Sequence, residues 1–306
     1  MNLVKKPPVS LSLMLVVGII AISFSAIFVK WSAAPAPVIA MNRLLITVLI
    51  MLPFIYKYLP EFRRISLRSY FSLFMSGLML GLHFLFWMES LRWTSVASST
   101  AILTLEPVLV MAGSFWVFRH KVSRTAIVAM AVAMFGAILI GWGDFRFSGD
   151  ALKGDLLSFI GTIAVAVHMI IGKSLRAHMS AYVYSMCVFL IGAFVLGVYS
   201  VAVGYPLFDY SADEWGLFFL LAVVSTLFGH YVFNWLLKYM SATTVSMAVL
   251  GEPLGATILA FFLLGESITP VQFAAGLLLL VGVAVFIRSQ EKEDITDHVP
   301  IAKKAT

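Results

Sequence analysis

The sequence contains little charge and a single cysteine, and both shortages exclude classes of protein. Only 12% of the 306 residues are charged, against about a quarter in soluble domains, and 61% are hydrophobic, so the chain is no ordinary soluble globule. Cys187 cannot form an intrachain disulfide, and a packing thiol explains it. The histidines are scattered singly, without acids or cysteines at metal-binding spacing, and no phosphate-binding loop occurs. We therefore expect no metal, no cofactor and no ATPase within the chain.

Long apolar runs recur along nearly the whole sequence. About twenty helical residues are needed to cross roughly 30 Å of hydrocarbon. The runs predict an all-α integral membrane protein with ten transmembrane helices, over residues 11–31, 37–57, 69–91, 94–118, 124–142, 154–174, 182–204, 213–237, 241–264 and 270–288. The first run resembles a signal peptide, but it is long for one and another span follows directly, so we interpret it as an uncleaved helix.

The turns between these runs differ in charge. Basic residues gather in the turns on the side of the N-terminus, and few lie on the other side. The positive-inside rule then places both termini of this multi-pass protein in the cytoplasm. The membrane explains the net charge of +6 better than nucleic acid does. Residues 291–306 are rich in charge and are predicted to form a disordered cytoplasmic tail.

The chain contains an internal repeat. At an offset of 146 residues, Glu106 and Pro107 align with Glu252 and Pro253, and Gly136 aligns with Gly282. The halves are residues 1–150 and 151–290. Five spans in each half is an odd number, so equivalent helices cross the membrane in opposite directions. Inverted repeats are typical of secondary transporters, although some channels have them, and one chain can already enclose a cavity as a monomer or within a homodimer.

The two Glu-Pro pairs lie deep in their spans. Each glutamate is about 12 residues from the end of its span, or roughly 18 Å at a helical rise. An ionised residue at that depth costs about 2.5–3.5 kcal/mol, so Glu106 and Glu252 should face a wet cavity, pair with a cation or carry a proton. Pro107 and Pro253 should break the helices and act as hinges. The alternatives are inherited kinks with protonated glutamates, a site for an amine substrate, or contacts that hold the halves together.

Other polar residues within the spans are weaker candidates for the same pathway. Two pairs share a helix face at a spacing of four, and a further histidine lies on the sixth span; together they are His83, Trp87, His168, His230 and Asn234. For each histidine, a packing role with a backbone hydrogen bond is an equally good interpretation.

Two arginines are open to simple explanations. Arg43 lies about six residues inside the second span, close enough for its side chain to reach the surface. It can equally bind an anionic group or pair with a cavity glutamate. Glu89 and Arg92, three apart near the end of the third span, are predicted to form an ordinary helix pair.

Three stretches resemble the EamA family of the drug/metabolite transporter superfamily. They are "FSAIFVKWSAAPAPVIAMNRLL", "LEPVLVMAG" and "GEPLGATILAFFLLGESITPVQFAAGLLLLVGV". The resemblance covers nearly the whole chain. It implies a multi-pass plasma-membrane carrier of small metabolites, such as amino acids, their derivatives or toxic compounds, often moved outward through a cavity between the halves. Two departures are His120, where the second half has Glu266, and Met186, near where the second half would carry the counterpart of Arg43.

These patterns favour a secondary transporter over an enzyme. We expect an exporter of small metabolites such as amino acids or amines, working by alternating access and driven by protons or by the substrate gradient. The alternatives are an intramembrane enzyme acting on a lipid-like substrate, for which no nucleophile and base occur at catalytic spacing, and a membrane sensor.

Overall fold

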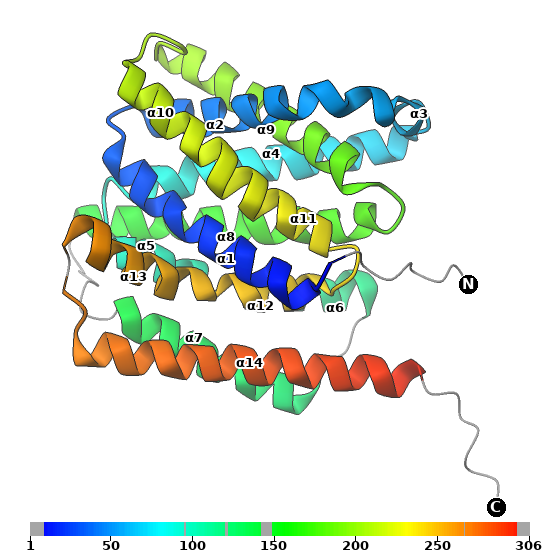
Figure 1. The fold of residues 1–306 in the computed structure, drawn as a ribbon, viewed down its shortest axis with the longest axis vertical. Helices are drawn as coiled ribbons and strands as arrows, with labels where there is room; N and C mark the ends of the chain where they lie inside the picture. Colours follow the sequence, from blue (N-terminus) through cyan, green and yellow to red (C-terminus); the bar gives the residue numbers. More distant parts are fainter. Residues whose placement is uncertain (1–8, 95, 120–121, 142–148, 266, 299–306) are drawn as a thin grey trace, which may run out of the picture.

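The structure is a computed structural model and describes residues 9–94, 96–119, 122–141, 149–265 and 267–298. It is a bundle of roughly parallel and antiparallel helices (Figure 1). The helices of the first half are α1 (Leu11–Trp31), α2 (Ala36–Met51), η1 (Leu52–Lys57), α3 (Leu59–Phe62), α4 (Leu67–Ser90), α5 (Val96–Leu103), α6 (Glu106–Phe118) and α7 (Arg124–Gly141). Those of the second half are α8 (Gly149–Arg176), α9 (Ala181–Val203), α10 (Ala212–Leu220), η3 (Leu221–Tyr231), α11 (Val232–Leu236), α12 (Ala242–Val249), α13 (Gly251–Leu264) and α14 (Pro270–His298).

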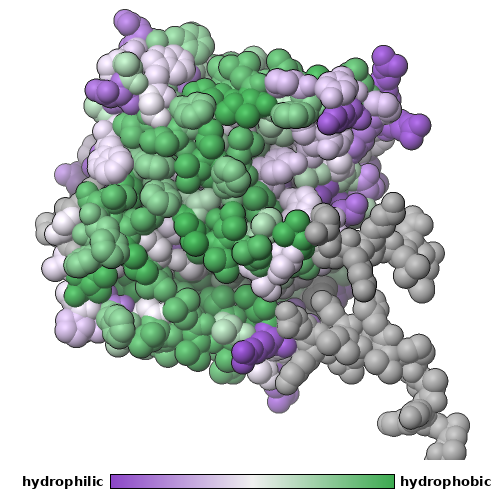
Figure 2. All heavy atoms as spheres, in the orientation of Figure 1, coloured by the Kyte–Doolittle hydropathy of each residue, from purple (hydrophilic) through white to green (hydrophobic). Residues whose placement is uncertain are grey.

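The predicted spans reappear as long apolar helices. Within the described ranges, nine helical segments are long and apolar enough to cross a membrane, and the segment Arg124–Ile140 is apolar but shorter. Ten crossings therefore remain a prediction, with α7 as the short one. Apolar side chains cover the middle of the face in Figure 2, and hydrophilic ones gather toward the two ends of the helices. This is the surface expected of a multi-pass membrane protein.

The C-terminal helix is longer than predicted. α14 continues to His298, so the prediction of a disordered tail from residue 291 is wrong as far as that residue, and residues 299–306 lie outside the described ranges. The sequence at 290–293, "QEKE", consists of strong helix formers, which extend the helix beyond the apolar run. We call the end of the bundle at which α1 begins and α14 ends the terminal end; the predicted orientation places it in the cytoplasm.

The fourth and ninth spans are each broken, as the Glu-Pro pairs predict. α5 ends at Leu103 and α6 begins at Glu106, while α12 ends at Val249 and α13 begins at Gly251. Pro107 has no N–H to give to the preceding turn, but a proline fits the first turn of a new helix. The break falls just before each glutamate, so Glu106 and Glu252 stand in the first turns of α6 and α13, where the helix dipole favours an acidic group.

The eighth span contains a feature that the sequence did not predict. Between α10 and α11, the 11 residues of η3 form a π-helix. Such stretches are rare and usually limited to a single turn. The Thr226 hydroxyl donates to the carbonyl of Leu221, five residues earlier (2.9 Å), and the Thr47 hydroxyl of α2 donates to the carbonyl of Ala222 (3.2 Å). Hydroxyl groups thus satisfy carbonyls of the widened helix.

The packing of α7 on α14 supports an inverted repeat. A Cβ built on Gly136 would meet the backbone of Ala275 and Leu279, and one built on Gly282 would meet that of Ala129 and Ala133. The two contacts are equivalent, because adding 146 to the residue numbers on α7 gives the residue numbers on α14. Because the partner number falls as the residue number rises, the two helices are antiparallel; they lie side by side at one edge of the bundle (Figure 1).

The remaining helices interlock the two halves. α1 packs mainly on η3 and α13, and its counterpart α8 packs mainly on α4, α5 and α6. The first helix of each half therefore lies against the third and fourth spans of the other half. A cavity in the middle of the bundle is lined by both halves for this reason.

Candidate functional site

A cavity in the centre of the bundle brings together seven of the eight predicted pathway residues. They come from five spans and are Glu106, Glu252, His83, Trp87, His168, His230 and Asn234. The eighth, Arg43, lies directly behind the wall, because its guanidinium contacts the lining residues Ser25 and Phe84. Single polar residues in six apolar helices, far apart in the sequence, thus meet at one place.

The two glutamates face the cavity from opposite halves. Their residues are 3% and 7% exposed, and they are close enough for their charges to interact. The helix breaks explain this placement, because each break turns the start of α6 or α13 toward the centre. The Oε1 atom of Glu106 has no hydrogen-bond partner among the described residues. A buried acceptor without a partner is costly, so this atom is available to a ligand, a water or a proton.

Arg43 is fully buried, so the prediction that its side chain reaches the surface is wrong. Its Nε donates to Thr226 Oγ1 (3.0 Å) and its Nη1 to Ser25 Oγ (3.2 Å), and the guanidinium lies 4.3 Å from the centre of the Phe84 ring. Its Nη2 has no partner among the described residues. The π-helix of η3 supplies Thr226, so the irregular span holds the arginine in place.

Arg43 makes no direct ion pair with a cavity glutamate. Within the described ranges, the single ion pair with atoms closer than 4.0 Å joins Glu89 and Arg92. Arg43 and Glu252 are near enough to interact electrostatically across a longer gap. The guanidinium and the carboxyl group of Glu252 are therefore near each other without a direct contact.

The histidines combine the two roles that the sequence left open. The Nδ1 of His83 bonds the carbonyl of Gly161 (3.0 Å), and the Nδ1 of His168 bonds the carbonyl of Ser76 (3.0 Å). Because a carbonyl only accepts, Nδ1 donates in both, and Nε2 is left as an acceptor. His230 meets the Phe84 ring edge-on at 4.9 Å. Within the described ranges, no group of three His, Cys, Asp or Glu side chains could hold a metal ion.

Trp87 adds a second donor to the cavity wall. Its Nε1 has no partner among the described residues, although the residue is buried. Asn234 is fixed by a bond from Nδ2 to Ser185 Oγ (3.1 Å). The cavity therefore offers a free donor from Trp87 and a free acceptor from Glu106, separated by aromatic surface, and Arg43 Nη2 is a further free donor directly behind the wall.

The cavity is too small in this conformation for a metabolite. The centre of a water-sized sphere can occupy about 50 Å³ of it. One water needs about 10–15 Å³ on this measure, and small-molecule pockets are several times larger overall. The site is closed, with room for a few waters.

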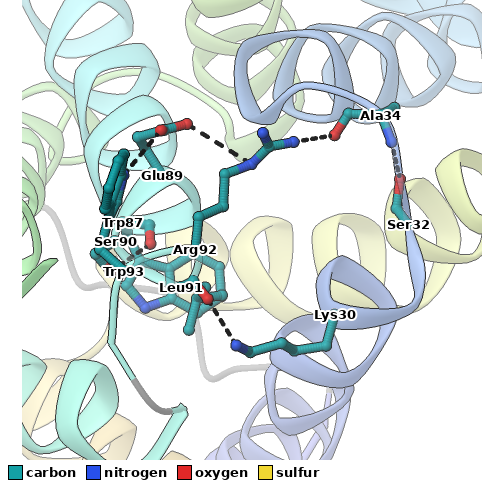
Figure 3. A network of polar contacts seen from close by, with 9 residues as sticks. All are labelled: Lys30, Ser32, Ala34, Trp87, Glu89, Ser90, Leu91, Arg92 and Trp93. Carbon is teal, nitrogen blue, oxygen red and sulfur yellow. Dashed lines mark hydrogen bonds and ion pairs between the residues drawn. The ribbon is translucent and has the colours of Figure 1, made fainter. Parts of the chain in front are cut away.

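At the end of the bundle opposite the termini, cationic side chains donate hydrogen bonds to backbone carbonyls and link the helix ends (Figure 3). Lys30 of α1 donates to the carbonyl of Leu91 (2.6 Å), and Arg92 donates to the carbonyl of Ala34 in the α1–α2 turn (2.7 Å). The predicted Glu89–Arg92 helix pair is confirmed at 3.8 Å. Its role is wider than expected, because Arg92 also holds the turn.

Contacts between the halves close both ends. At the opposite end, Glu214 of α10 accepts bonds from the Ser32 hydroxyl and from the Ala33 N–H (2.7 Å). At the terminal end, Glu61 of α3 accepts from the Ser180 N–H (2.5 Å). Within the second half, Lys173, the counterpart of Lys30, donates to the carbonyls of Leu237 (2.9 Å) and Met240 (2.8 Å).

A model of the EamA-like transporter family matches residues 10–142 and again residues 152–288. The chain belongs to the EamA-like transporter family. An uncharacterized transporter of Archaeoglobus fulgidus is 23% identical over 208 residues, covering 65% of this chain and 70% of the relative. The uncharacterized transporter YetK of Bacillus subtilis is 26% identical over 226 residues, covering 70% of this chain and 66% of the relative. These matches support a membrane transporter.

The fold also matches a crystal structure of a protein with a TM-score of 0.75 over 92% of this chain and 98% of the other, at 15% identity. That likeness concerns the fold alone. His120 in the first half and its counterpart Glu266 in the second, which the resemblance singled out, lie outside the described residues.

Sequence reasoning missed the residues that hold the site in place. They are Ser25, Phe84 and Thr226 around Arg43, and Ser76 and Tyr184 beside His168. One signal was available for the hydroxyl residues, since buried ionisable side chains need hydrogen-bond partners. Arg176, at the end of α8, is also buried and donates to the carbonyls of Asn234 and Met179.

Proposed function

We propose that this chain is a secondary transporter that exports small amine-bearing metabolites, such as amino acids, across the plasma membrane in exchange for protons. The exchange proceeds by alternating access around the cavity between Arg43 and the two glutamates. The observation that carries the proposal is the set of unpartnered groups: donors at Arg43 Nη2 and Trp87 Nε1, and an acceptor at Glu106 Oε1. An amino acid has a carboxylate for the donors and an ammonium group for the acceptor.

The charge balance of the site supports exchange with a cation. The buried guanidinium of Arg43 interacts with Glu252, and Glu252 interacts with Glu106. A buried charge without a partner is strongly disfavoured. Arg43 compensates one negative charge. The other carboxyl group needs a proton or a substrate ammonium group, and these two cations compete for it. Competition at one group couples the outward movement of substrate to the inward movement of protons.

The closed cavity supports alternating access. A substrate cannot fit the site as it stands, so one end must open to admit it. The bonds that join the halves at the two ends, through Glu214 and Glu61, can break separately. The inverted packing of α7 on α14 gives the halves equivalent structures, which is the arrangement that lets two repeats exchange conformations.

Counterflow tests the proposal. Purified protein in sealed liposomes is preloaded with amino acids, amines or nucleosides in turn, and uptake of the labelled compound is followed without and with an imposed pH gradient. We expect exchange of one amine-bearing class and accumulation when protons are driven inward. Glu106→Gln and Glu252→Gln should each reduce exchange at least tenfold. Asp213→Asn, which neutralises an exposed acid on α10, is the matched control.

Two results would contradict the proposal. Full exchange activity in the double Glu106→Gln, Glu252→Gln variant would show that the carboxyl groups are not in the pathway. Flux of labelled substrate without any trans-side compound and without saturation would indicate a channel in place of a carrier.

A further inference from the structure

A second, polar cavity opens at the terminal end of the bundle, away from the transport site. It lies among η1, α3, the start of α4 and the turn between α8 and α9, and the centre of a water-sized sphere can occupy about 640 Å³ of it. Its wall carries the basic side chains of Lys57 and Arg64, with His178 and the hydroxyl groups of Ser66 and Ser69. The space is more than ten times that of the transport cavity on the same measure.

The cations of this cavity are not used within the protein. Among the described residues, Arg64 and His178 have no side-chain hydrogen bond or ion pair, and Lys57 only approaches the rings of Phe54 and Tyr56, at 5.8 and 5.7 Å. The acid of the cavity, Glu61, is engaged by the Ser180 N–H. Residues 57–68 carry four basic side chains and one acidic one. The cavity is thus suited to an anion.

An apolar groove continues from the polar cavity and shares Lys57 and Tyr58 with it. The groove offers about 310 Å³ on the same measure and is lined by Ile50, Met51, Phe54, Tyr182, Leu227 and Tyr231. The rings of Tyr58 and Tyr182 stack at 4.1 Å and form its wall. A cationic pocket and an apolar groove therefore meet at one lysine.

We propose that this composite site binds an anionic glycerophospholipid of the adjacent leaflet, with the phosphate head group in the polar cavity and an acyl chain in the groove. A soluble anion would leave the groove empty, and a lipid without net charge would leave the cations uncompensated. Figure 2 shows hydrophilic side chains at the end of the bundle where Figure 1 places α3. They lie beside the apolar band, at the depth where a lipid head group would lie. Basic residues just outside a membrane span attract anionic lipids.

The groove and the transport cavity are both lined by residues of η3. The groove's lining residues Leu227 and Tyr231 belong to η3, the π-helix whose Thr226 holds Arg43. His230, the neighbour of Tyr231, lines the transport cavity. An acyl chain in the groove packs against the irregular helix from the lipid side and supports the backbone that positions the arginine.

Lipid binding can be measured on the whole protein by native mass spectrometry. Protein purified in detergent is titrated with phosphatidylglycerol or with phosphatidylcholine of the same chains, and bound lipid is counted. We expect phosphatidylglycerol to bind at least tenfold more tightly, less so at high salt. Lys57→Gln with Arg64→Gln should weaken binding about thirtyfold, since each basic residue contributes to the attraction of an anionic lipid. Arg124→Gln, an exposed arginine at the same end outside the site, should bind as the parent does.

A soluble competitor distinguishes the lipid from a free phosphate compound. Glycerol 3-phosphate at millimolar concentration should not displace the lipid; displacement would assign the site to a soluble anion and overturn the proposal. Equal binding of the two lipids would also overturn it, and this comparison needs no variant. Binding unchanged in the double variant, with an unaltered elution profile and thermal unfolding, would place the lipid elsewhere.

Discussion

The contact of α7 with α14 permits a sharp test of the fold, because two glycines at equivalent positions carry it. An ideal Cβ on Gly282 would lie 2.5 Å from the backbone nitrogen of Ala133, and one on Gly136 would lie 2.7 Å from the backbone of Leu279. Neither clash can be relieved by a side-chain rotation. The two helices must separate by about 0.9 Å at Gly282 before an added methyl group reaches an ordinary contact of 3.4 Å. Overpacking of this kind costs about 1–3 kcal/mol.

We therefore expect Gly282→Ala and Gly136→Ala to lower the unfolding free energy by similar amounts, about 1–3 kcal/mol each. The control is Gly216→Ala in α10, where a Cβ would meet nothing within 4 Å. There an alanine should stabilise the helix by about 0.5–1 kcal/mol, because it restricts the unfolded backbone. Thermal unfolding of the purified variants in one detergent, followed by intrinsic fluorescence, gives the order of stability.

The double variant Gly136→Ala, Gly282→Ala tests the geometry further. Both methyl groups push the same two helices apart, so their effects should not be additive, and the second substitution should cost less than the first. α7 and α14 contribute no residue to the transport cavity, so the substrate concentration for half-maximal exchange should not change. Variants as stable as the parent would refute the close packing, and opposite effects at the two glycines would refute the equivalence of the halves.

Three further predictions concern single side chains. Arg43→Lys keeps the charge but loses the forked donors, so exchange should fall about ten- to hundredfold with folding retained, as expected from the loss of one charged hydrogen bond; an unchanged rate would contradict the site. Arg119→Gly should raise thermal stability by about 1 kcal/mol, because this arginine ends α6 with a φ of 57°, which favours glycine; a loss of stability would show a contact that offsets the strain. Glu214→Gln should weaken closure of the end opposite the termini. A cysteine introduced by Val249→Cys in the cavity wall, in a Cys187→Ser background, should then react faster with an aqueous thiol reagent added from that side. Equal rates would show that Glu214 does not limit opening.

The fold was largely predictable because its main determinants are local. Apolar runs of about twenty residues define spans, and a proline in mid-span forces a break whatever surrounds it. The breaks at α5–α6 and α12–α13 fall where Pro107 and Pro253 predict them, and the offset of 146 reappears in the ends of α6 and α13, at Phe118 and Leu264. The prediction missed that residues 291–298 continue α14, because it gave the charge of this segment more weight than its helix propensity.

The details of the site were predictable only where a residue was unusual for its position. A carboxyl group or a histidine in an apolar helix stands out, and these residues do meet in one cavity. A serine or a phenylalanine in such a helix is ordinary, so neither Ser25 nor Phe84 stands out by itself. The need of buried ionisable groups for hydrogen-bond partners points to hydroxyl residues in general and not to a particular one. One of the bonds to the carbonyls of the π-helix joins Thr47 and Ala222, which are 175 residues apart, and a local pattern holds no information about such a contact.

The asymmetry of the cavity limits how the two halves can work. The repeat holds for the backbone of α6 and α13 and for the glycines of α7 and α14. It does not hold for Arg43. At the offset of 143 that relates Lys30 to Lys173, the counterpart of Arg43 is the buried Met186. If the halves exchange conformations as proposed, the exchange swaps which end is open, while the guanidinium behind the cavity wall remains that of Arg43 on α2. An anionic group of the substrate then binds the same side chain in both states, while its cationic group shares the two glutamates with protons. The substrate keeps one orientation in the protein, and the states facing the two sides of the membrane have different energies, so the direction of net transport is set by the gradients and not by the symmetry of the scaffold.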